Sequence, residues 1–338
     1  MKAEEIVSAV YEWYEKRDQQ APERTYLGAS EIGHSCSRYL WLNFRCAFKA
    51  HFDGRMLRLF NTGHRAESRF VDELAGLGWK VRPVDGKGKQ FECSYANGHM
   101  CGHCDGVASE DGKEWFLLEF KTYNAKRFAS LVKTGVRQDS EKYWYQMHFY
   151  MGMIDLQRCL FMAENKDNSE VYCEWVDYDA DECRKACDKA ERIINSKGAP
   201  DRITDRPDWY ECKFCSAAGV CWGREMPRKN CRTCVCSTPV ENGRWSCEMG
   251  GVIPEDVEMS GCPEHVFHPY MMPWEPVDSG DGLVLYANGV CNCSASGFPA
   301  SDDVKAIFNS DELALVKPSQ IDEIIKAKQV FGGKVVEG

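Results

Sequence analysis

CDGVASEDGKEWFLLEFK, residues 104–121, combines acidic, basic and apolar residues in a pattern that indicates the fold class. Its apolar run ends in Glu119, Phe120 and Lys121, and residues i and i+2 of a strand share one face. We therefore expect Glu119 and Lys121 to point together and Phe120 to point into packing. Asp105 ends the preceding strand across a tight turn, so it can lie beside Glu119. The stretch predicts a hairpin that presents two carboxylates and a lysine.

This trio suits metal-dependent hydrolysis of a phosphodiester bond. Asp105 and Glu119 would repel each other, and a divalent cation between them removes that penalty. Two carboxylates with phosphate oxygens suit Mg²⁺ or Mn²⁺, which polarises the phosphate and lowers the pKa of a bound water. Lys121 can position that water and offset developing charge. The alternative is a surface hairpin with an ordinary Glu/Lys pair, because Glu-x-Lys alone is a common pattern.

Two expected helices add polar residues to the trio. His64 lies on the earlier helix, where a neutral imidazole could serve as a third metal ligand, and Glu67 is the alternative ligand. Gln146 and Tyr150, spaced i and i+4, share one face of the later helix. They could contact DNA or orient the lysine.

The ordered set resembles the RecB-like nucleases of the PD-(D/E)xK superfamily, whose order is His, Asp, Glu-x-Lys and Gln-xxx-Tyr. The matching residues are His64, Asp105, Glu119, Lys121, Gln146 and Tyr150. The resemblance covers about residues 28 to 225, and one departure is a first motif that reads Cys-Asp-Gly instead of Pro-Asp.

This resemblance implies an α/β fold with a restriction-endonuclease-like core, in which helices flank a small mixed sheet. It also implies a Mg- or Mn-dependent DNA exonuclease that acts on ends or single strands, in recombination, repair or replication, with a recombination or replication protein as a further partner. Two alternatives stay open. One is a catalytically silent module that binds DNA or recruits a partner, and the other is a structure-specific endonuclease.

Four cysteines enclose the stretch that carries the resemblance. Cys36 stands early, and Cys212, Cys215 and Cys221 follow late with C-x2-C-x5-C spacing. Four thiolates are enough for a 4Fe-4S cluster, and zinc is the alternative. The resemblance favours the cluster, because iron-sulfur exonucleases similar to the CRISPR-adaptation and AddB-type nucleases have this one-plus-three arrangement.

A second cysteine group looks like a structural zinc ribbon or knuckle. It consists of Cys231, Cys234, Cys247 and Cys262, and His265 could replace one thiol, while Cys236 is a possible decoy. Arg232, Arg244 and Trp245 within it could also touch DNA or a partner. The pair Cys101 and Cys104 reads as buried thiols.

Composition limits the remaining possibilities. The chain has 338 residues, 43% of them hydrophobic, with 19 cysteines and a net charge of -10. No apolar run approaches the roughly 20 residues of a membrane helix, and the first residues do not look like a signal, so we expect a cytoplasmic protein that uses cysteine as a metal ligand. The net charge disfavours non-specific coating of nucleic acid unless positive charge is clustered. Clusters of Arg and Lys do occur in the N-terminal third and from Lys121 onward. The alternative is that these charges lie on solvated helix faces.

We expect four segments. Residues 1–78 form the helical start of the nuclease domain, 79–226 its core, 227–275 a zinc-stabilised module, and 276–338 an extension of unknown role. Expected helices span about 57–77, 143–154, 180–196 and 319–330. Expected strands lie at 79–84, 90–95, 115–123, 159–165 and 171–178. Residues 212–273 contain too many Cys, Gly and Pro to build a hydrophobic core of their own, so we expect metal to substitute for it.

Overall fold

A computed structural model describes residues 2–299 and 301–337. The fold is mixed α/β, with twelve α-helices and four small sheets among these residues. The chain forms two compact units. The first contains the residues up to His34, His51–Ala96 and Met100–Glu191, and the second contains Ser35–Ala50, Asn97–His99 and the residues from Arg192 on. This grouping differs from the four consecutive segments expected above.

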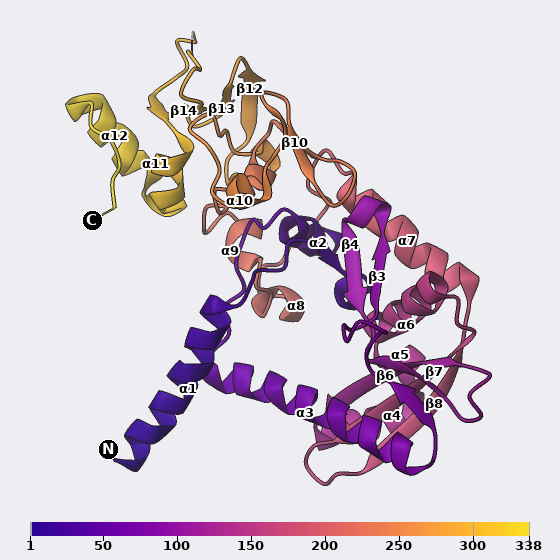
Figure 1. Cartoon of the computed structure of the whole chain (residues 1–338). Helices are drawn as coiled ribbons and strands as arrows, with labels where there is room; N and C mark the ends of the chain where they lie inside the picture. Colours follow the sequence, from indigo (N-terminus) through magenta and orange to yellow (C-terminus); the bar gives the residue numbers. More distant parts are fainter. Residues whose placement is uncertain (1, 300, 338) are drawn as a thin grey trace. The chain divides into compact units, whose positions relative to one another are not determined.

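A five-stranded sheet forms the centre of the first unit (Figure 1). Its order is β2 (Lys80–Arg82), β5 (Gly106–Ser109), β6 (Phe116–Tyr123), β7 (Arg158–Asn165) and β8 (Val171–Asp177). The central strand β6 pairs antiparallel with β5 and parallel with β7. Parallel neighbours need a long crossover, and here three helices form it: α4 (Ala125–Thr134), α5 (Val136–Asp139) and α6 (Glu141–Ile154).

Helix α3 (Gly54–Gly76) covers one face of this sheet. The side chain of Asp53 caps its first turn by accepting a hydrogen bond from the Met56 amide at 2.7 Å. Phe70 of α3 is buried against Phe120 of β6, with ring centroids 5.0 Å apart. Phe120 is 3% exposed, so the prediction that it points into packing is confirmed.

The first unit is completed by two further helices and a second small sheet. Helix α1 (Ala3–Gln20) packs against α3, and α7 (Ala180–Ile194) belongs to this unit as far as Glu191. The small sheet has the order β1 (Leu27–Gly28), β4 (Met100–His103), β3 (Glu92–Tyr95). Cys101 and Cys104 are buried here and form no disulfide, as expected.

The second unit combines short helices with two sheets. Its helices are α2 (Ser37–Phe44), α8 (Tyr210–Lys213), α9 (Ala218–Cys221), α10 (Glu255–Glu258), α11 (Ser310–Leu315) and α12 (Ile321–Phe331). One sheet contains β9 (Ser237–Pro239), β10 (Trp245–Cys247) and β11 (Gly251–Val252). The other contains β12 (Pro276–Gly280), β13 (Leu283–Tyr286), β14 (Val290–Cys293) and β15 (Ala306–Phe308).

The second unit has a hydrophobic core, which corrects one expectation. Val266, Phe267 and Met272 are buried together with Tyr286 and Phe308. Residues 212–273 therefore do bury apolar side chains, against partners from the C-terminal sheet and helices. None of the described helices is both long enough and apolar enough to span a membrane.

Candidate active site

Asp105 and Glu119 meet where strand β5 leaves β6. The ladder pairs Val107 with Leu117 and Gly106 with Leu118, so one step further Asp105 stands opposite Glu119. Directly opposite residues of an antiparallel pair point to the same face. Asp105 does not continue the ladder with its backbone. Its Oδ2 instead accepts a hydrogen bond from the amide of Phe120 at 2.7 Å, which anchors this carboxylate beside Glu119.

Glu119 is fully buried and forms an ion pair with Lys121 through Oε1. Its other oxygen, Oε2, is buried and has no hydrogen-bond partner among the described residues. Burial raises the pKa of Glu119, Lys121 opposes that shift, and the charge of Asp105 adds to it. A buried carboxylate oxygen without a donor is costly, so this atom marks a place where a cation would be stabilised.

Lys121 remains charged in this site. Burial acts to lower its pKa, but the negative charges of Glu119 and Asp105 outweigh burial, and the net pKa is raised. Its Nζ also donates to the carbonyl of Phe120 at 3.1 Å and lies 5.0 Å from the ring centroid of Tyr143. The side chain keeps about a fifth of its surface exposed and lines a pocket.

Helix α3 brings Glu67 rather than His64 toward the trio. Gly63, Glu67 and Phe70 lie on one face of α3 and line a pocket together with Lys121, whereas His64, one position along, is exposed. Burial and the charge of Asp105 raise the pKa of Glu67, while His64 and Lys121 act to lower it. Both candidate ligands are therefore near the site, and Glu67 is the one that faces the pocket.

Gln146 and Tyr150 of α6 are buried on the same face, as their spacing predicts. They are 5% and 2% exposed, and the Gln146 amide lies 3.4 Å from the Tyr150 hydroxyl. Burial raises the pKa of Tyr150, and the charge of Glu119 contributes to the shift. Of the two roles considered above, such buried side chains fit orientation of the strand residues better than contact with DNA.

Tyr143 and Lys166 were not anticipated. Both line the pocket of about 360 Å³ beside Lys121. Tyr143 precedes Gln146 by three positions on α6, so the same helical periodicity could have identified it. Lys166 follows β7, and only the parallel pairing of β7 with β6 brings it to this edge.

The first cysteine set gathers within the second unit. Cys36 caps the start of α2, where its Sγ accepts a hydrogen bond from the Tyr39 amide at 3.4 Å. Burial raises the pKa of Cys215, and the charges of Cys36, Cys221 and Cys212 add to that shift. The fold thus brings the early cysteine to the three late ones, although 176 residues separate Cys36 from Cys212 in the chain.

The second cysteine set also gathers in the second unit. Burial raises the pKa of Cys231 to about 11, and the charges of Cys262, Cys234 and Cys247 contribute in that order. Cys236, the possible decoy, instead hydrogen bonds with Cys234 and lowers the pKa of that thiol to about 6.

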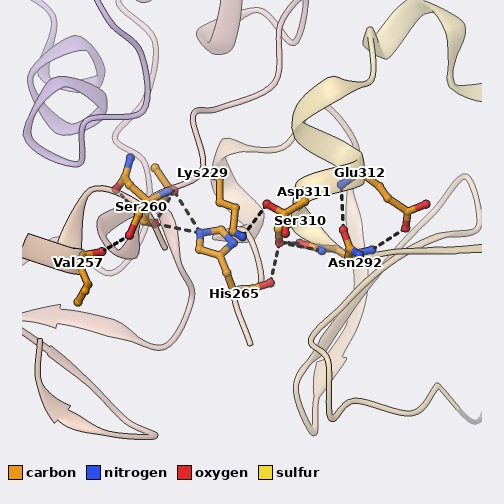
Figure 2. Close-up of polar contacts among 11 residues, drawn as sticks. Lys229, Val257, Ser260, His265, Asn292, Ser310, Asp311 and Glu312 are labelled. Atoms are coloured by element: carbon orange, nitrogen blue, oxygen red, sulfur yellow. Dashed lines mark hydrogen bonds and ion pairs between the residues drawn. The ribbon is translucent and has the colours of Figure 1, made fainter. Parts of the chain in front are cut away.

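His265 takes part in a different set of contacts (Figure 2). Its Nε2 lies 3.0 Å from the carbonyl of Asn230, and its own carbonyl accepts a hydrogen bond from Ser310 at 2.6 Å. Burial lowers the pKa of His265 to about 4, so the ring is neutral. In this arrangement His265 contacts Asn230 and Ser310, while the charge of Cys262 acts on Cys231.

As the side chains are placed, no group of three or more His, Cys, Asp and Glu within residues 2–299 and 301–337 could hold a metal ion. The cysteine side chains of both sets would have to move closer together to bind an ion or a cluster. A magnesium site has a smaller requirement, since this ion usually takes one or two protein carboxylates and keeps several waters.

Comparison with known proteins gives structural similarity alone. No family model and no curated protein matches the sequence. SSO0001 aligns with 64% of this chain and 96% of its own, at 13% identity and a TM-score of 0.39. The alkaline exonuclease LHK-Exo from Laribacter hongkongensis aligns with 54% of this chain and 90% of its own, at 15% identity and a TM-score of 0.38. Its complex with dAMP covers the same shares at 17% identity and a TM-score of 0.39. At these TM-scores the structural similarity supports no conclusion about function.

Proposed function

We propose that this chain is a metal-dependent DNA nuclease in which Asp105, Glu119 and Lys121 carry out phosphodiester hydrolysis. The observation that supports the proposal is the Glu119 carboxylate, which is 0% exposed and has a buried Oε2 without a donor among the described residues. A fold stabilises such an atom poorly by itself. A bound divalent cation would supply the missing partner.

The donor set fits Mg²⁺ or Mn²⁺. Asp105 and Glu119 offer carboxylate oxygens on one face, and Glu67 or His64 stands at the side of α3 as a further ligand. Hard oxygen ligands of this kind suit these cations. When bound, the cation would polarise a phosphate and lower the pKa of a coordinated water.

Lys121 has a distinct task. Because its pKa is raised, its ammonium stays protonated at neutral pH, so it stabilises negative charge on the phosphate and does not accept a proton. The Tyr143 ring and the Phe120 carbonyl hold Nζ in place. Gln146 and Tyr150 lie beneath these residues in the interior, where they act as positioning residues.

The test uses end-labelled linear DNA and closed circular DNA with Mg²⁺ or Mn²⁺. Wild type should degrade the linear substrate, and Glu119→Ala and Lys121→Ala should slow this by about 100-fold or more, as loss of one charge-stabilising group usually does. Glu114→Ala and Lys113→Ala are matched controls on the exposed turn before β6 and should cleave at the wild-type rate.

Each outcome of this experiment has a clear reading. Equal degradation by wild type and both site variants would remove the proposal. Cleavage of the linear substrate alone supports an exonuclease, whereas cleavage of the circle supports an endonuclease. DNA retention without any product would support a binding module instead.

We further propose that the cysteine sets hold structural metals. Cys36, Cys212, Cys215 and Cys221 would bind a 4Fe-4S cluster, and Cys231, Cys234, Cys247 and Cys262 would bind zinc. Anaerobic purification followed by iron, sulfide and zinc analysis tests both. Cys215→Ser should lose iron and sulfide but keep zinc, and Cys247→Ser should do the reverse. A protein with zinc and no iron would remove the cluster assignment.

A further inference from the structure

The pocket beside Lys121 has walls of two kinds. Lys121, Lys166 and Glu67 supply charge, while Phe60, Phe120 and Tyr143 supply aromatic surface. Its volume of about 360 Å³ is at the lower end of the roughly 300–1,000 Å³ of small-molecule pockets. A base that enters a pocket of this kind must first leave its stack, which costs least for a base that is already unpaired.

Phe60 is the exposed part of the aromatic wall. It lies on α3 with 43% of its surface exposed, although a large apolar ring on a helix is normally buried or shielded. Its ring is fixed by an edge contact with Phe52, with centroids 5.1 Å apart and an interplanar angle of 80°. An aromatic ring that is fixed in position and has one exposed face is suited to stacking on another planar ring.

The other aromatic residues of the wall already have partners. Tyr143 lies against the Lys121 ammonium, and Phe120 packs on Phe70 in the core. Phe60 therefore offers the accessible face, and Lys166 adds a second cation beside Lys121 for phosphate oxygens. Aromatic stacking combined with nearby cations is how proteins bind single strands without reading sequence.

We propose that this pocket receives a nucleotide that has left the base stack, with its base stacked on Phe60 and its phosphate directed to Lys121 and Lys166. The inference rests on the proposed nuclease function and assigns to Phe60 the preference for an unstacked end over a paired one. Phe60 would then determine specificity without touching the reacting phosphate.

The experiment measures base stacking rather than hydrolysis. The full chain is titrated into a single-stranded oligonucleotide that carries 2-aminopurine at its terminal position and a phosphorothioate at the adjacent linkage, in Ca²⁺. A second oligonucleotide with the label at the other end determines which terminus enters the pocket. A blunt duplex with the same labelled end is the matched substrate, and gel analysis verifies that the DNA stays intact.

Wild type should quench the fluorescence of the single strand and bind the blunt duplex more weakly. Phe60→Ala should abolish the quenching and weaken single-strand binding by about 5- to 150-fold, the range that corresponds to one stacked base. Phe60→Trp should keep both, which separates stacking from a defect in folding. Trp13→Ala, which removes an exposed ring of α1 outside the pocket, should behave as wild type.

Unchanged quenching and affinity in Phe60→Ala would overturn the inference, and so would equal binding of the blunt duplex and the single strand. These results are independent of the Glu119 test. If the Glu119 variant cleaves normally while Phe60→Ala loses quenching, only the catalytic assignment fails. If Glu119→Ala is inactive and Phe60→Ala still quenches, only the pocket assignment fails.

Discussion

Replacing Gly106 by alanine should damage both the stability of the first unit and its candidate active site. Gly106 opens β5 directly after Asp105, and its φ of +146° belongs to a region that side chains rarely adopt. An added Cβ would lie 2.8 Å from the carbonyl oxygen of Arg82 and 3.0 Å from the Cα of Pro83. Both are backbone atoms of the neighbouring strand region, so neither can rotate away as a side chain would.

The expected cost has two parts. Forcing this backbone conformation on a residue with a Cβ costs about 1–3 kcal/mol. Overpacking against fixed atoms adds about 1–3 kcal/mol, which gives about 2–6 kcal/mol in total. Gly88 provides a matched control, because it also has a positive φ, +76°, but an added Cβ would meet nothing within 4 Å. Gly88→Ala should lower the free energy of unfolding by about 1–2 kcal/mol, the cost of a left-handed backbone conformation alone.

Urea unfolding of wild type and both variants measures the difference. The loss of stability in Gly106→Ala should exceed that in Gly88→Ala by about 2.5 kcal/mol, the difference between the middles of the two ranges, with unchanged m values. Cleavage per folded molecule should also fall in Gly106→Ala alone, because the start of β5 positions Asp105 for its bond to the Phe120 amide. Equal unfolding midpoints for the two alanine variants would refute the steric reasoning.

Three further predictions concern burial and charge. Phe70→Ala should lower the free energy of unfolding in urea by about 3–5 kcal/mol, because the ring is buried between α3 and β6. The control Leu77→Ala, at a position 70% exposed, should change it by about 0.5 kcal/mol or less. Burial and the charge of Arg45 lower the pKa of His268 to about 3. The unfolded histidine has a pKa of about 6.5, so below this pH the unfolded state binds a proton that the folded state does not, and the folded state loses stability as the pH decreases. Urea unfolding at pH 5 should therefore show a loss, relative to pH 7.5, that is about 2 kcal/mol smaller in His268→Phe than in wild type. Glu258→Gln removes the carboxylate paired with the buried Arg232 and should cost about 3–5 kcal/mol by the same assay, and a loss below about 1 kcal/mol would contradict the buried pairing.

Local periodicity predicted the elements around the site well. The strand period predicted that Phe120 packs in the core, although β6 is buried on both faces from Phe116 to Phe120. The spacing of Gln146 and Tyr150 predicted their shared face. The helix expected over residues 57–77 begins earlier, at Gly54. Glycine is a poor helix former, but here a Cβ would come within 2.2 Å of the Tyr11 carbonyl of α1, so a tertiary contact selects this residue.

Two features of the fold could not be predicted from local sequence patterns: helix α4 and the core of the second unit. Helix α4 is not evident from the sequence, because positive charge dominates its segment, although Asn124 caps it and Phe128 and Leu131 bury one face. The core of the second unit was missed for a different reason. A window over residues 212–273 cannot show that Phe267 packs with residues beyond 284.

Within the candidate site, the rotation of one helix decides between two ligands. His64 and Glu67 are three positions apart on α3, and both precede Asp105 in the chain. The apolar face that contains Phe70 fixes the rotation, and this places Glu67 at the pocket and leaves His64 exposed. A ligand role for either residue is a prediction that Glu67→Ala and His64→Ala can separate by metal affinity, with the larger loss expected for Glu67.

The Asp-Gly pair says more about this site than the Glu-x-Lys pattern does. Glu-x-Lys fixes only that two side chains share a face of β6, which many exposed hairpins also achieve. Gly106 lets the chain enter β5 with a backbone conformation that other residues rarely adopt. The carboxylate of Asp105 then accepts a hydrogen bond from the Phe120 amide, in place of a backbone bond of the ladder. The two strands therefore separate beside Glu119, whose Oε2 is left without a donor among the described residues. In the function proposed above, the cation and the phosphate would be held where the strands separate. This is why perturbing Gly106 should affect stability and chemistry together.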